Sequence, residues 1–259
     1  MKGQPVVYLM YHEIELAGRP MCHCNPGYQR YVVRKRDFEN QMRSLTNRGW
    51  HGQSVGEALL HPRLPGVVLT FDDGCETDLL TAAPMIREVG FSATFYVTVG
   101  FLGERGYLTR TQLRELADLG CEIGSHSMTH RYLPDLAPDA LTHEVSDSKK
   151  ELSQITGRSI DHFSCPGGRW NPIVEAAAKQ AGYLSFATSE TVTNLAPTGA
   201  FRVGRVAIMR ETGLESFHRL ICGQGLWKMR LADSARATVK KILGNGAYDR
   251  VRRRLLEHK

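Results

Sequence analysis

Short β-rich runs alternate with helical patterns along this chain, and this alternation limits the fold more than any other feature of the sequence. Strand patterns occupy residues 6–10, 66–71, 93–99, 121–124, 163–165, 184–188 and 203–209, and helical patterns occupy 37–48, 79–89, 109–119, 138–156 and 172–181. Such an order favours a parallel sheet, open or closed, with helices on its outside. In folds of this kind, functional residues lie where strands end and loops begin.

The composition is that of one large α/β domain or two small ones. Of 259 residues, 42% are hydrophobic and 23% are charged, which excludes collagen-like, low-complexity and wholly disordered chains. No run approaches the ~20 apolar residues that a membrane span needs. Residues 1–11 lack the small-residue cleavage site of a signal peptide. We therefore predict a cytoplasmic protein, with contact at the inner face of the membrane as a further option.

The net charge of +6 is unevenly distributed. Residues 228–259 hold ten Lys and Arg and three Asp and Glu, a net charge of +7, so residues 1–227 sum to −1. Because the body is near neutral, nucleic acid is not an expected partner. The basic segment predicts a separate helical extension. It either packs on residues 1–227 or docks on an anionic membrane surface, where each Lys or Arg adds ~1 kcal/mol.

Six cysteines are spread thinly through the chain, and we expect them to be reduced thiols. Cys22, His23 and Cys24 do not form the CxxC spacing of a zinc ribbon. The Pro and Gly residues around them favour a loop over a second metal site. Cys75, next to an acidic pair, is interpreted as a small packing residue.

Two polar motifs follow strand patterns and carry the chemistry of the chain. Asp72 and Asp73 are adjacent at the end of one strand pattern, and His126 and His130 lie four residues apart after another. Alone, each motif is more typical of a turn or a structural histidine pair. Together, one carboxylate and two imidazoles form a facial ligand set that leaves positions open for water and substrate. The second carboxylate is then free to act as a base, and a metal would lower the pKa of water toward ~7.

The segments TFDDG (70–74) and HSMTH (126–130) resemble the first two motifs of the polysaccharide deacetylases, the NodB homology group also called carbohydrate esterase family 4. The opening YLMYH (8–12) resembles the first strand of many members, and the resemblance extends over residues 5–212. It implies a distorted (β/α)7 barrel, with the catalytic domain at residues 1–227. It also implies removal of an acetyl group, usually from an N-acetylated saccharide.

Carried over position by position, the resemblance implies that Asp72 is the general base and that Asp73, His126 and His130 bind a divalent metal. Zinc is most often the metal of the family, and Co²⁺, Ni²⁺ or Fe²⁺ also suit this ligand set. The metal would polarise the amide carbonyl while Asp72 takes a proton from the attacking water.

The third motif departs from the family pattern. It reads FSCPGGRWN (163–171), a Pro-Gly-Gly variant without the arginine that would steady Asp72, and Arg169 is a candidate to replace that arginine. Two adjacent glycines would let the backbone approach a ligand closely. The residues predicted to line the substrate or oxyanion site are Pro166, Gly167, Gly168, Arg169 and Trp170.

The proton donor that the family uses is also missing. Arg210 stands where a histidine is expected, and because arginine stays protonated it is predicted to stabilise negative charge instead. His12, which follows the first strand pattern, is the better candidate for the general acid, although a core histidine bonded to backbone is as typical of this place. His218, eight residues after Arg210, is a weaker candidate.

Three hypotheses follow. The leading one is a metal-dependent N-deacetylase acting on N-acetylhexosamine units of a poly-, oligo- or lipid-linked saccharide. The second is a hydrolase of another non-peptide C–N bond, such as a ureido or imide group in a small molecule. The third is a catalytically inactive carbohydrate-binding homologue, which the missing acid favours and the complete Asp-Asp-His-His set opposes. Chelator-sensitive turnover separates the third hypothesis from the first two.

Overall fold

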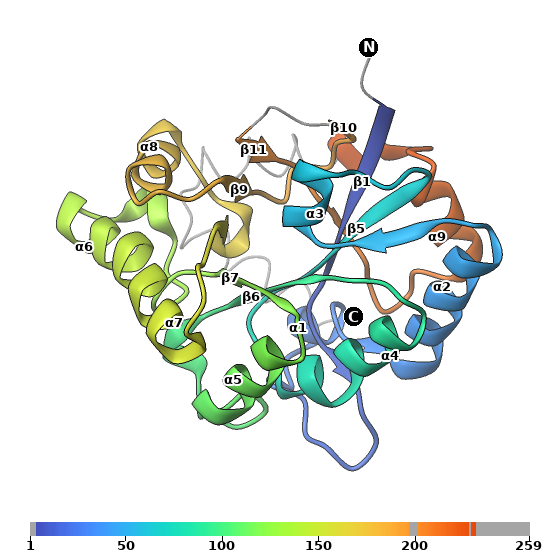
Figure 1. The fold of residues 1–259 in the computed structure, drawn as a ribbon, viewed down its shortest axis with the longest axis horizontal. Helices are drawn as coiled ribbons and strands as arrows, with labels where there is room; N and C mark the ends of the chain where they lie inside the picture. The colour runs from blue at the N-terminus through green and yellow to red at the C-terminus, as the bar shows by residue number, and fades with distance from the viewer. Residues whose placement is uncertain (1–3, 197–200, 228, 232–259) are drawn as a thin grey trace.

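The computed structural model describes residues 4–196, 201–227 and 229–231 (Figure 1). The predicted basic extension over residues 228–259 therefore lies almost wholly outside the described residues, and the division at residue 227 stays a prediction. Among the residues that are described, no helix combines the length and the apolar character needed to cross a bilayer.

The main sheet is a ring of parallel strands that curls back on itself. Its strands, in spatial order, are β1 (Gln4–Tyr11), β5 (Gly66–Phe71), β6 (Thr94–Val97), β7 (Glu122–Ser125), β8 (His162–Ser164) and β9 (Ser185–Ala187). The last position is divided between β11 (Arg202–Val203), which pairs with β9, and β12 (Val206–Ala207), which pairs with β1. Because this divided strand joins the two edges, the predicted distorted (β/α)7 barrel is confirmed.

Three smaller pairings complete the strands. The short strand β4 (His51–Gln53) lies beside the first half of β5, and β10 (Asn194–Ala196) runs antiparallel to β1. A separate two-stranded sheet joins β2 (Ile14–Glu15) to β3 (Val33–Arg34). The sequence patterns did not predict these pieces, because each is only two or three residues long and carries no measurable period.

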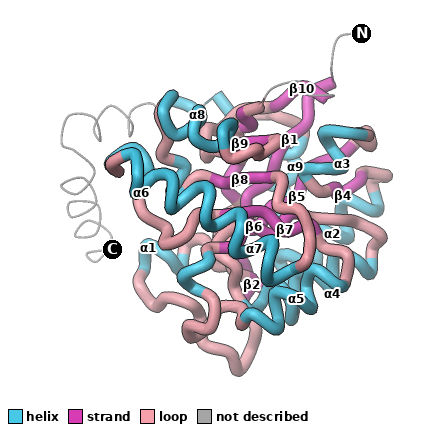
Figure 2. The backbone as a smooth tube through the Cα atoms, turned by 60° about the vertical axis from the view of Figure 1, so that its left-hand side comes forward, coloured by secondary structure: helices cyan, strands magenta, loops and turns pink. Residues whose placement is uncertain are grey.

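Helices cover the outside of the ring (Figure 2). They are α1 (Pro26–Gln29), α2 (Lys35–Asn47), α3 (Val55–Leu60), α4 (Ala83–Glu88), α5 (Arg110–Asp118), α6 (Pro138–Thr142), α7 (Ser148–Thr156), α8 (Pro172–Gln180) and α9 (Leu214–Ile221). Two π-helical segments, η1 (Asp78–Ala82) and η4 (His143–Asp147), lead into α4 and α7. Tight 3₁₀ turns lie at η2 (Val99–Phe101), η3 (Leu133–Asp135) and η5 (Pro166–Gly168).

The helix ends follow ordinary capping chemistry. Thr109 and Gln112 form a reciprocal capping box at the start of α5. Asn171 caps α8 through the backbone N–H of Val174, and α7 ends at Gly157 with a positive φ of 67°. These signals explain why the helical patterns predicted from the sequence agree with the observed ends to within a few residues.

Alternate side chains of each strand point to opposite sides of the sheet, and this sets the direction of the functional groups. Leu69 and Phe71 on β5 pack in the large core that lies against the helices, whereas Val68 packs with Tyr8 and Tyr96 in a second cluster inside the ring. Asp72 follows with the parity of Val68. Its carboxylate is therefore directed toward the interior of the barrel.

The predicted strand over residues 203–209 is in fact broken between β11 and β12. Gly204 lies at the break, where an added Cβ would come within 2.4 Å of the Glu190 carbonyl oxygen. The following residue, Arg205, is 1% exposed and sends its side chain into the barrel. Val203 also packs inside the ring, so Arg205 keeps the inward parity of β11.

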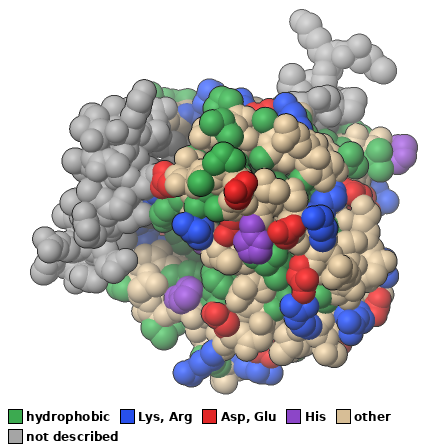
Figure 3. All heavy atoms as spheres, turned by 90° about the vertical axis from the view of Figure 1, so that its left-hand side faces the viewer, with side chains coloured by type: hydrophobic (Ala, Val, Ile, Leu, Met, Phe, Trp, Pro, Cys, Tyr) green, Lys and Arg blue, Asp and Glu red, His purple; other side chains and the backbone are tan. Residues whose placement is uncertain are grey.

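The outer face over α6 and α7 carries basic, acidic and hydrophobic side chains in mixture, with no single sign of charge across it (Figure 3). Ion pairs account for part of this pattern. Asp147 pairs with His143 and Lys150, and Arg110 pairs with Glu151. Among the described residues, this face therefore offers no extended basic surface for a polyanion.

Candidate active site

The two acidic and two histidine residues singled out from the sequence meet at the C-terminal ends of neighbouring strands. Asp72 and Asp73 follow the last residue of β5, and His126 and His130 follow the last residue of β7. Only β6 separates the two strands. In parallel α/β folds this edge is where ligands bind.

Asp73, His126 and His130 bring one donor atom each to a common point. Asp73 Oδ1 lies 3.5 Å from His126 Nε2 and 3.4 Å from His130 Nε2. Two oxygen or nitrogen ligands, each ~2.1 Å from a tetrahedral metal, are separated by about 3.4 Å. The observed separations therefore fit a single ion held by these three residues.

The backbone that presents these donors is strained. Asp73, Ser127 and His130 have φ values of 83°, 70° and 60°, and they are the non-glycine residues with positive φ in the described part of the chain. Such conformations cost about 1–3 kcal/mol each and persist where the surrounding structure enforces them. All three lie in the two motifs, which indicates that strained backbone sets the direction of these side chains at a cost in stability.

Glu144 holds the histidine loop in place. Its carboxylate is 2% exposed and accepts hydrogen bonds from the backbone N–H groups of Met128 and Thr129, at 2.9 and 2.8 Å, and from the Thr129 hydroxyl. Glu144 lies in the π-helical segment η4, and no motif in the sequence marks it. It is a positioning residue for His130.

His126 is oriented by the chain as a metal ligand would be. Its Nδ1 lies 2.8 Å from the carbonyl oxygen of Ser164, and because a carbonyl can only accept, Nδ1 carries the proton. The Nε2 lone pair then faces Asp73. Burial, chiefly, lowers the pKa of His126 to about 4, so the ring is neutral near pH 7, as metal ligation requires.

The carboxylate donor atom of the site is left unsatisfied by the described residues. Asp73 Oδ1 is buried and has no hydrogen-bond partner among the described residues. A buried carboxylate oxygen that faces a nitrogen lone pair is costly unless a cation lies between them. The residues therefore fit a divalent metal, and one carboxylate with two imidazoles suits zinc and its neighbours in the first transition row.

Asp72 has a different environment from its neighbour. Arg205 reaches it across the barrel with two hydrogen bonds, Nη1 to Oδ1 and Nη2 to Oδ2, both 2.7 Å. Burial alone would raise the pKa of Asp72, but the charges of Arg205 and then His126 hold that pKa well below its usual range. Asp72 is therefore ionised at neutral pH and kept apart from the metal-binding group.

All five N–H donors of Arg205 are used. Besides Asp72, they reach the Thr70 hydroxyl, the Ser164 hydroxyl and the Thr188 carbonyl oxygen. Ser164 therefore serves two groups, since its hydroxyl contacts the Asp72–Arg205 pair and its carbonyl orients His126. The only signal for Arg205 in the sequence is a charged residue inside an otherwise apolar strand pattern.

The prediction that Arg169 replaces the missing arginine is wrong. The guanidinium of Arg169 lies 3.6 Å from the centre of the Tyr132 ring, and the ion pair with Asp72 is made by Arg205. Trp170 donates from Nε1 to Glu190 at 3.1 Å and is stacked by Arg202 at 3.9 Å. A substrate-contacting role for Arg169 and Trp170 stays a prediction.

The Pro166-Gly167-Gly168 turn follows β8 on the same side as the histidines. Both glycines have positive φ, 61° and 64°. A Cβ on Gly168 would lie 1.7 Å from the Ser189 hydroxyl, so the close approach at this position is to the chain itself. The close approach predicted here for a ligand is therefore made at Gly168 by Ser189.

The side chains of His12 and Arg210 differ in whether they already have hydrogen-bond partners, and this difference bears on which of them can donate a proton. His12 follows β1, its ring packs on Tyr31 at 4.7 Å, and its buried Nδ1 has no hydrogen-bond partner among the described residues. Arg210 pairs with both oxygens of Glu15 at 3.1 and 3.2 Å and donates to the Val32 carbonyl oxygen. The guanidinium of Arg210 thus ties the small β2–β3 sheet to the barrel.

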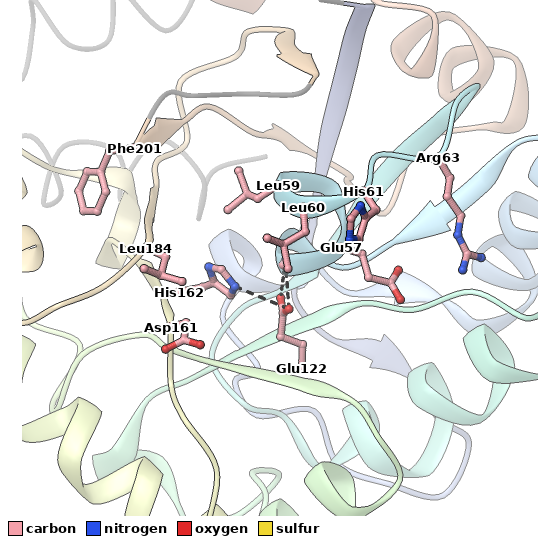
Figure 4. A pocket seen from close by; sticks show the side chains of 11 residues that line it. Glu57, Leu59, Leu60, His61, Arg63, Glu122, Asp161, His162, Leu184 and Phe201 are labelled. Atoms are coloured by element: carbon pink, nitrogen blue, oxygen red, sulfur yellow. Dashed lines mark hydrogen bonds and ion pairs between the residues drawn. The ribbon is translucent and has the colours of Figure 1, made fainter.

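A hollow of about 730 Å³ opens at the other end of the barrel (Figure 4). Its lining comes from residues at or just before the starts of strands, including Glu122 on β7 and His162 on β8, and from Leu60 on α3. It contains none of the predicted site residues. The N-terminal ends of parallel strands usually serve stability, so we assign this hollow no part in the reaction.

A curled parallel barrel with two carboxylates and two histidines after β5 and β7 is the architecture of the NodB-type deacetylases. The family model described as polysaccharide deacetylase matches residues 62–186. The Bacillus subtilis protein YxkH is 30% identical to this chain over 206 residues, which are 77% of this chain and 70% of that protein. Its name provisionally describes it as a polysaccharide deacetylase. The chain belongs to the polysaccharide deacetylase family.

Two further relatives extend this result. The peptidoglycan-N-acetylglucosamine deacetylase of Bacillus cereus is 34% identical over 119 residues, 45% of this chain and 53% of that protein. The Streptococcus pyogenes deacetylase PplD, solved in complex with acetate, superposes with a TM-score of 0.72 and 25% identity. That superposition covers 85% of this chain and 99% of the PplD chain.

Proposed function

We propose that the protein is a metal-dependent N-deacetylase that hydrolyses the acetamide of N-acetylhexosamine units in a poly-, oligo- or lipid-linked saccharide. One observation carries the proposal. Asp73, His126 and His130 converge on one point, where Asp73 Oδ1 has no hydrogen-bond partner among the described residues, and beside them Asp72 is held ionised by Arg205. A carbohydrate deacetylase needs this pairing of a metal site and a separate base.

The residues divide the work as follows. Asp73, His126 and His130 would hold the metal, whose chemistry is to act as a Lewis acid toward a carbonyl oxygen and toward water. Asp72, whose low pKa keeps it ionised, accepts a proton from the attacking water. Arg205 holds the carboxylate of Asp72 in one orientation and keeps it from turning toward the metal ligands.

The proton for the departing amine is assigned to His12. It stands at the end of β1, its charge acts on the carboxyl of Asp72, and its Nδ1 is free of any hydrogen bond among the described residues. Arg210, by contrast, is engaged by Glu15. An imidazole can release a proton near neutral pH and a guanidinium cannot, which favours His12 over Arg210 as the acid.

Acetate release from N-acetylglucosamine oligomers tests the proposed reaction. The protein is assayed as purified, after chelation, and after Zn²⁺ or Co²⁺ is restored. We expect release that chelation abolishes and metal restores. If the metal is bound at the site and no oligomer releases acetate, free N-acetylglucosamine chains are not the substrate, and a lipid-linked sugar, the small C–N substrates of the second hypothesis and a binding role are tested next.

The role of His12 is tested with His12→Gln and two substrates that differ in their leaving group. An alkyl acetamide needs a proton on the departing amine, whereas an aryl acetate leaves without one. We expect His12→Gln to lower the turnover of the amide strongly and that of the aryl ester little. Equal losses on both substrates would mean that His12 only supports the structure.

Membrane contact through residues 228–259 and a location at the inner face of the membrane stay predictions. They rest on the net charge of +7 in that segment. Sedimentation with anionic vesicles, compared between the full chain and a chain ending at residue 227, is the measurement. Binding by the full chain alone supports docking, and no binding by the full chain contradicts it.

A further inference from the structure

A second group of metal-binding side chains lies outside the deacetylase motifs. Glu13, Cys22 and Cys75 come from three separate segments, and their carboxylate oxygen and two sulfurs lie within 4.8 Å of one another. Glu13 follows β1, and Cys75 follows the two aspartates. The loop predicted around Cys22, His23 and Cys24 is present, but the chain turns only Cys22 toward this group, while His23 bonds to Tyr107 at 2.9 Å.

The distance between the two sulfurs fits shared coordination. Cys22 Sγ lies 3.5 Å from Cys75 Sγ. Two thiolates, each ~2.3 Å from a tetrahedral zinc ion, are about 3.8 Å apart, whereas the sulfurs of a disulfide are about 2.05 Å apart. Further oxygens lie close by, since the Tyr28 hydroxyl is 3.4 Å from Cys75 Sγ and the Gly106 carbonyl oxygen is 3.1 Å from Cys22 Sγ.

The burial and charge of this group call for a cation. Glu13 is 2% exposed and Cys75 is 0% exposed. Within the described residues, Glu13 forms no ion pair with a Lys, Arg or His side chain. Asp78, also 0% exposed and one turn after Cys75, has no hydrogen-bond partner for either carboxylate oxygen in the described part of the chain. Buried acidic groups without a counter-ion are costly, and a metal ion removes that cost.

We propose that Glu13, Cys22 and Cys75 form a second metal site for a thiophilic divalent cation such as Zn²⁺, separate from the Asp73/His126/His130 site. One carboxylate and two thiolates give a soft ligand set that favours zinc over magnesium or calcium. The site joins the loop around Cys22 to the segment that follows β5. Its occupancy therefore ties this loop to the chain that carries Asp72 and Asp73.

Cobalt titration of the reduced chain tests this site, because thiolate ligands give Co²⁺ a charge-transfer band in the near ultraviolet that oxygen and nitrogen ligands do not give. We expect two equivalents of Co²⁺ and this band for the unchanged protein. Cys22→Ser is expected to bind one equivalent and to lose the band. Cys24→Ser, an exposed cysteine in the same loop, is the matched control and is expected to keep both.

Two more variants keep the test decisive if Cys22→Ser does not fold. His126→Ala removes a ligand of the other site and is expected to retain one equivalent with the band. Glu13→Gln keeps both thiols and is expected to keep the band with a lower cobalt affinity. A single equivalent without the band in the reduced, unchanged protein overturns the proposal, and so does a band that survives in a folded Cys22→Ser. Neither result depends on deacetylase activity.

Discussion

Each end of the barrel carries a carboxylate beside a histidine, but the two pairs differ in how well the protein satisfies their polar atoms. At the N-terminal ends of the strands, Glu122 on β7 lies 3.6 Å from His162 on β8. At the C-terminal ends, Asp73 lies 3.5 Å from His126. The distances are nearly equal, so distance does not tell a structural pair from a functional one.

The surroundings of the two pairs do separate them. Glu122 accepts hydrogen bonds from the backbone N–H of Gly56 and from the hydroxyls of Ser54 and Thr94, and His162 Nδ1 bonds to Ser185 at 2.9 Å. At the other end, Asp73 Oδ1 has no hydrogen-bond partner among the described residues, and its own backbone has a φ of 83°.

The comparison shows what marks a site in this fold. A pair whose oxygens and nitrogens all have hydrogen-bond partners contributes to stability. A pair on strained backbone with an unsatisfied oxygen is instead arranged to bind a group that the protein itself does not supply. The hollow beside Glu122 has a volume of about 730 Å³, yet the polar atoms of its Glu122–His162 pair already have partners in the protein. The following predictions test this distinction.

The largest effect is expected at the functional end. Asp72→Asn should lower turnover by about 10²–10⁴-fold, because an amide cannot accept the proton from water. The variant should still bind the metal, since its ligands are unchanged. His126→Ala should lose both activity and metal at that site. Metal content by mass spectrometry and acetate release measure the two effects, and equal metal loss in both variants would contradict the division of roles.

The next largest effect is expected at Arg205. Arg205→Met removes one partner of a buried ion pair and leaves Asp72 charged without compensation, which should cost about 3–5 kcal/mol of unfolding free energy. Chemical denaturation measures this loss. The double variant with Asp72→Asn should recover part of it, because the uncompensated charge is then gone. If the double variant is no more stable than Arg205→Met, the pair does not act as a unit.

A smaller effect, of opposite kind, is expected at the other end. Glu122→Gln should lower the unfolding free energy by about 1–3 kcal/mol, because its hydrogen-bond network then lacks an acceptor, and should leave kcat unchanged. The matched variant, Asp73→Asn, should cost less stability in metal-free protein and should reduce the thermal shift that added Zn²⁺ gives to that of the remaining site. A large loss of activity in a folded Glu122→Gln would break the comparison.

The smallest effect is expected in the hollow itself. Leu60 is 74% exposed there, and Leu60→Ser should change the unfolding free energy by less than about 0.5 kcal/mol. The KM for N-acetylglucosamine oligomers should not change, because the hollow and the predicted catalytic residues lie at opposite ends of the strands. A raised KM would mean that the saccharide extends into the hollow.

Much of the fold follows from the sequence because its signals are local. Capping residues such as Thr109 and Asn171 fix helix starts, and apolar runs such as residues 66–71 can only be buried strands. The two motifs could also be placed, since each directly follows a strand. What could not be predicted depends on contacts between distant segments. Glu144 lies in a helical pattern, where acidic residues are common. No neighbouring residue in the sequence indicates that its carboxylate accepts hydrogen bonds from the loop that carries His130.

Arg205 illustrates the same limit. In the sequence it stands five residues before Arg210, inside the predicted strand of residues 203–209 that Arg210 follows. Arg205 has the inward parity of Val203, while Arg210 lies beyond β12 and reaches Glu15. Periodicity does not single out Arg205, because the two-residue strands β11 and β12 are too short to carry a period. Arg169 lies nearer to a motif in the sequence, but proximity along the chain does not bring it to Asp72.

The place of Arg205 in the chain also bears on how the protein is made. It lies 133 positions after Asp72 and beyond residue 186, where the family match ends. A chain leaving the ribosome releases its N-terminal part first, so β1 to β9 emerge while Asp72 still lacks its counter-charge. Enclosing a lone carboxylate is costly. The barrel should therefore stay open until the last strand has been synthesised. The ring of strands then closes in the same folding step in which Arg205 compensates the charge of Asp72.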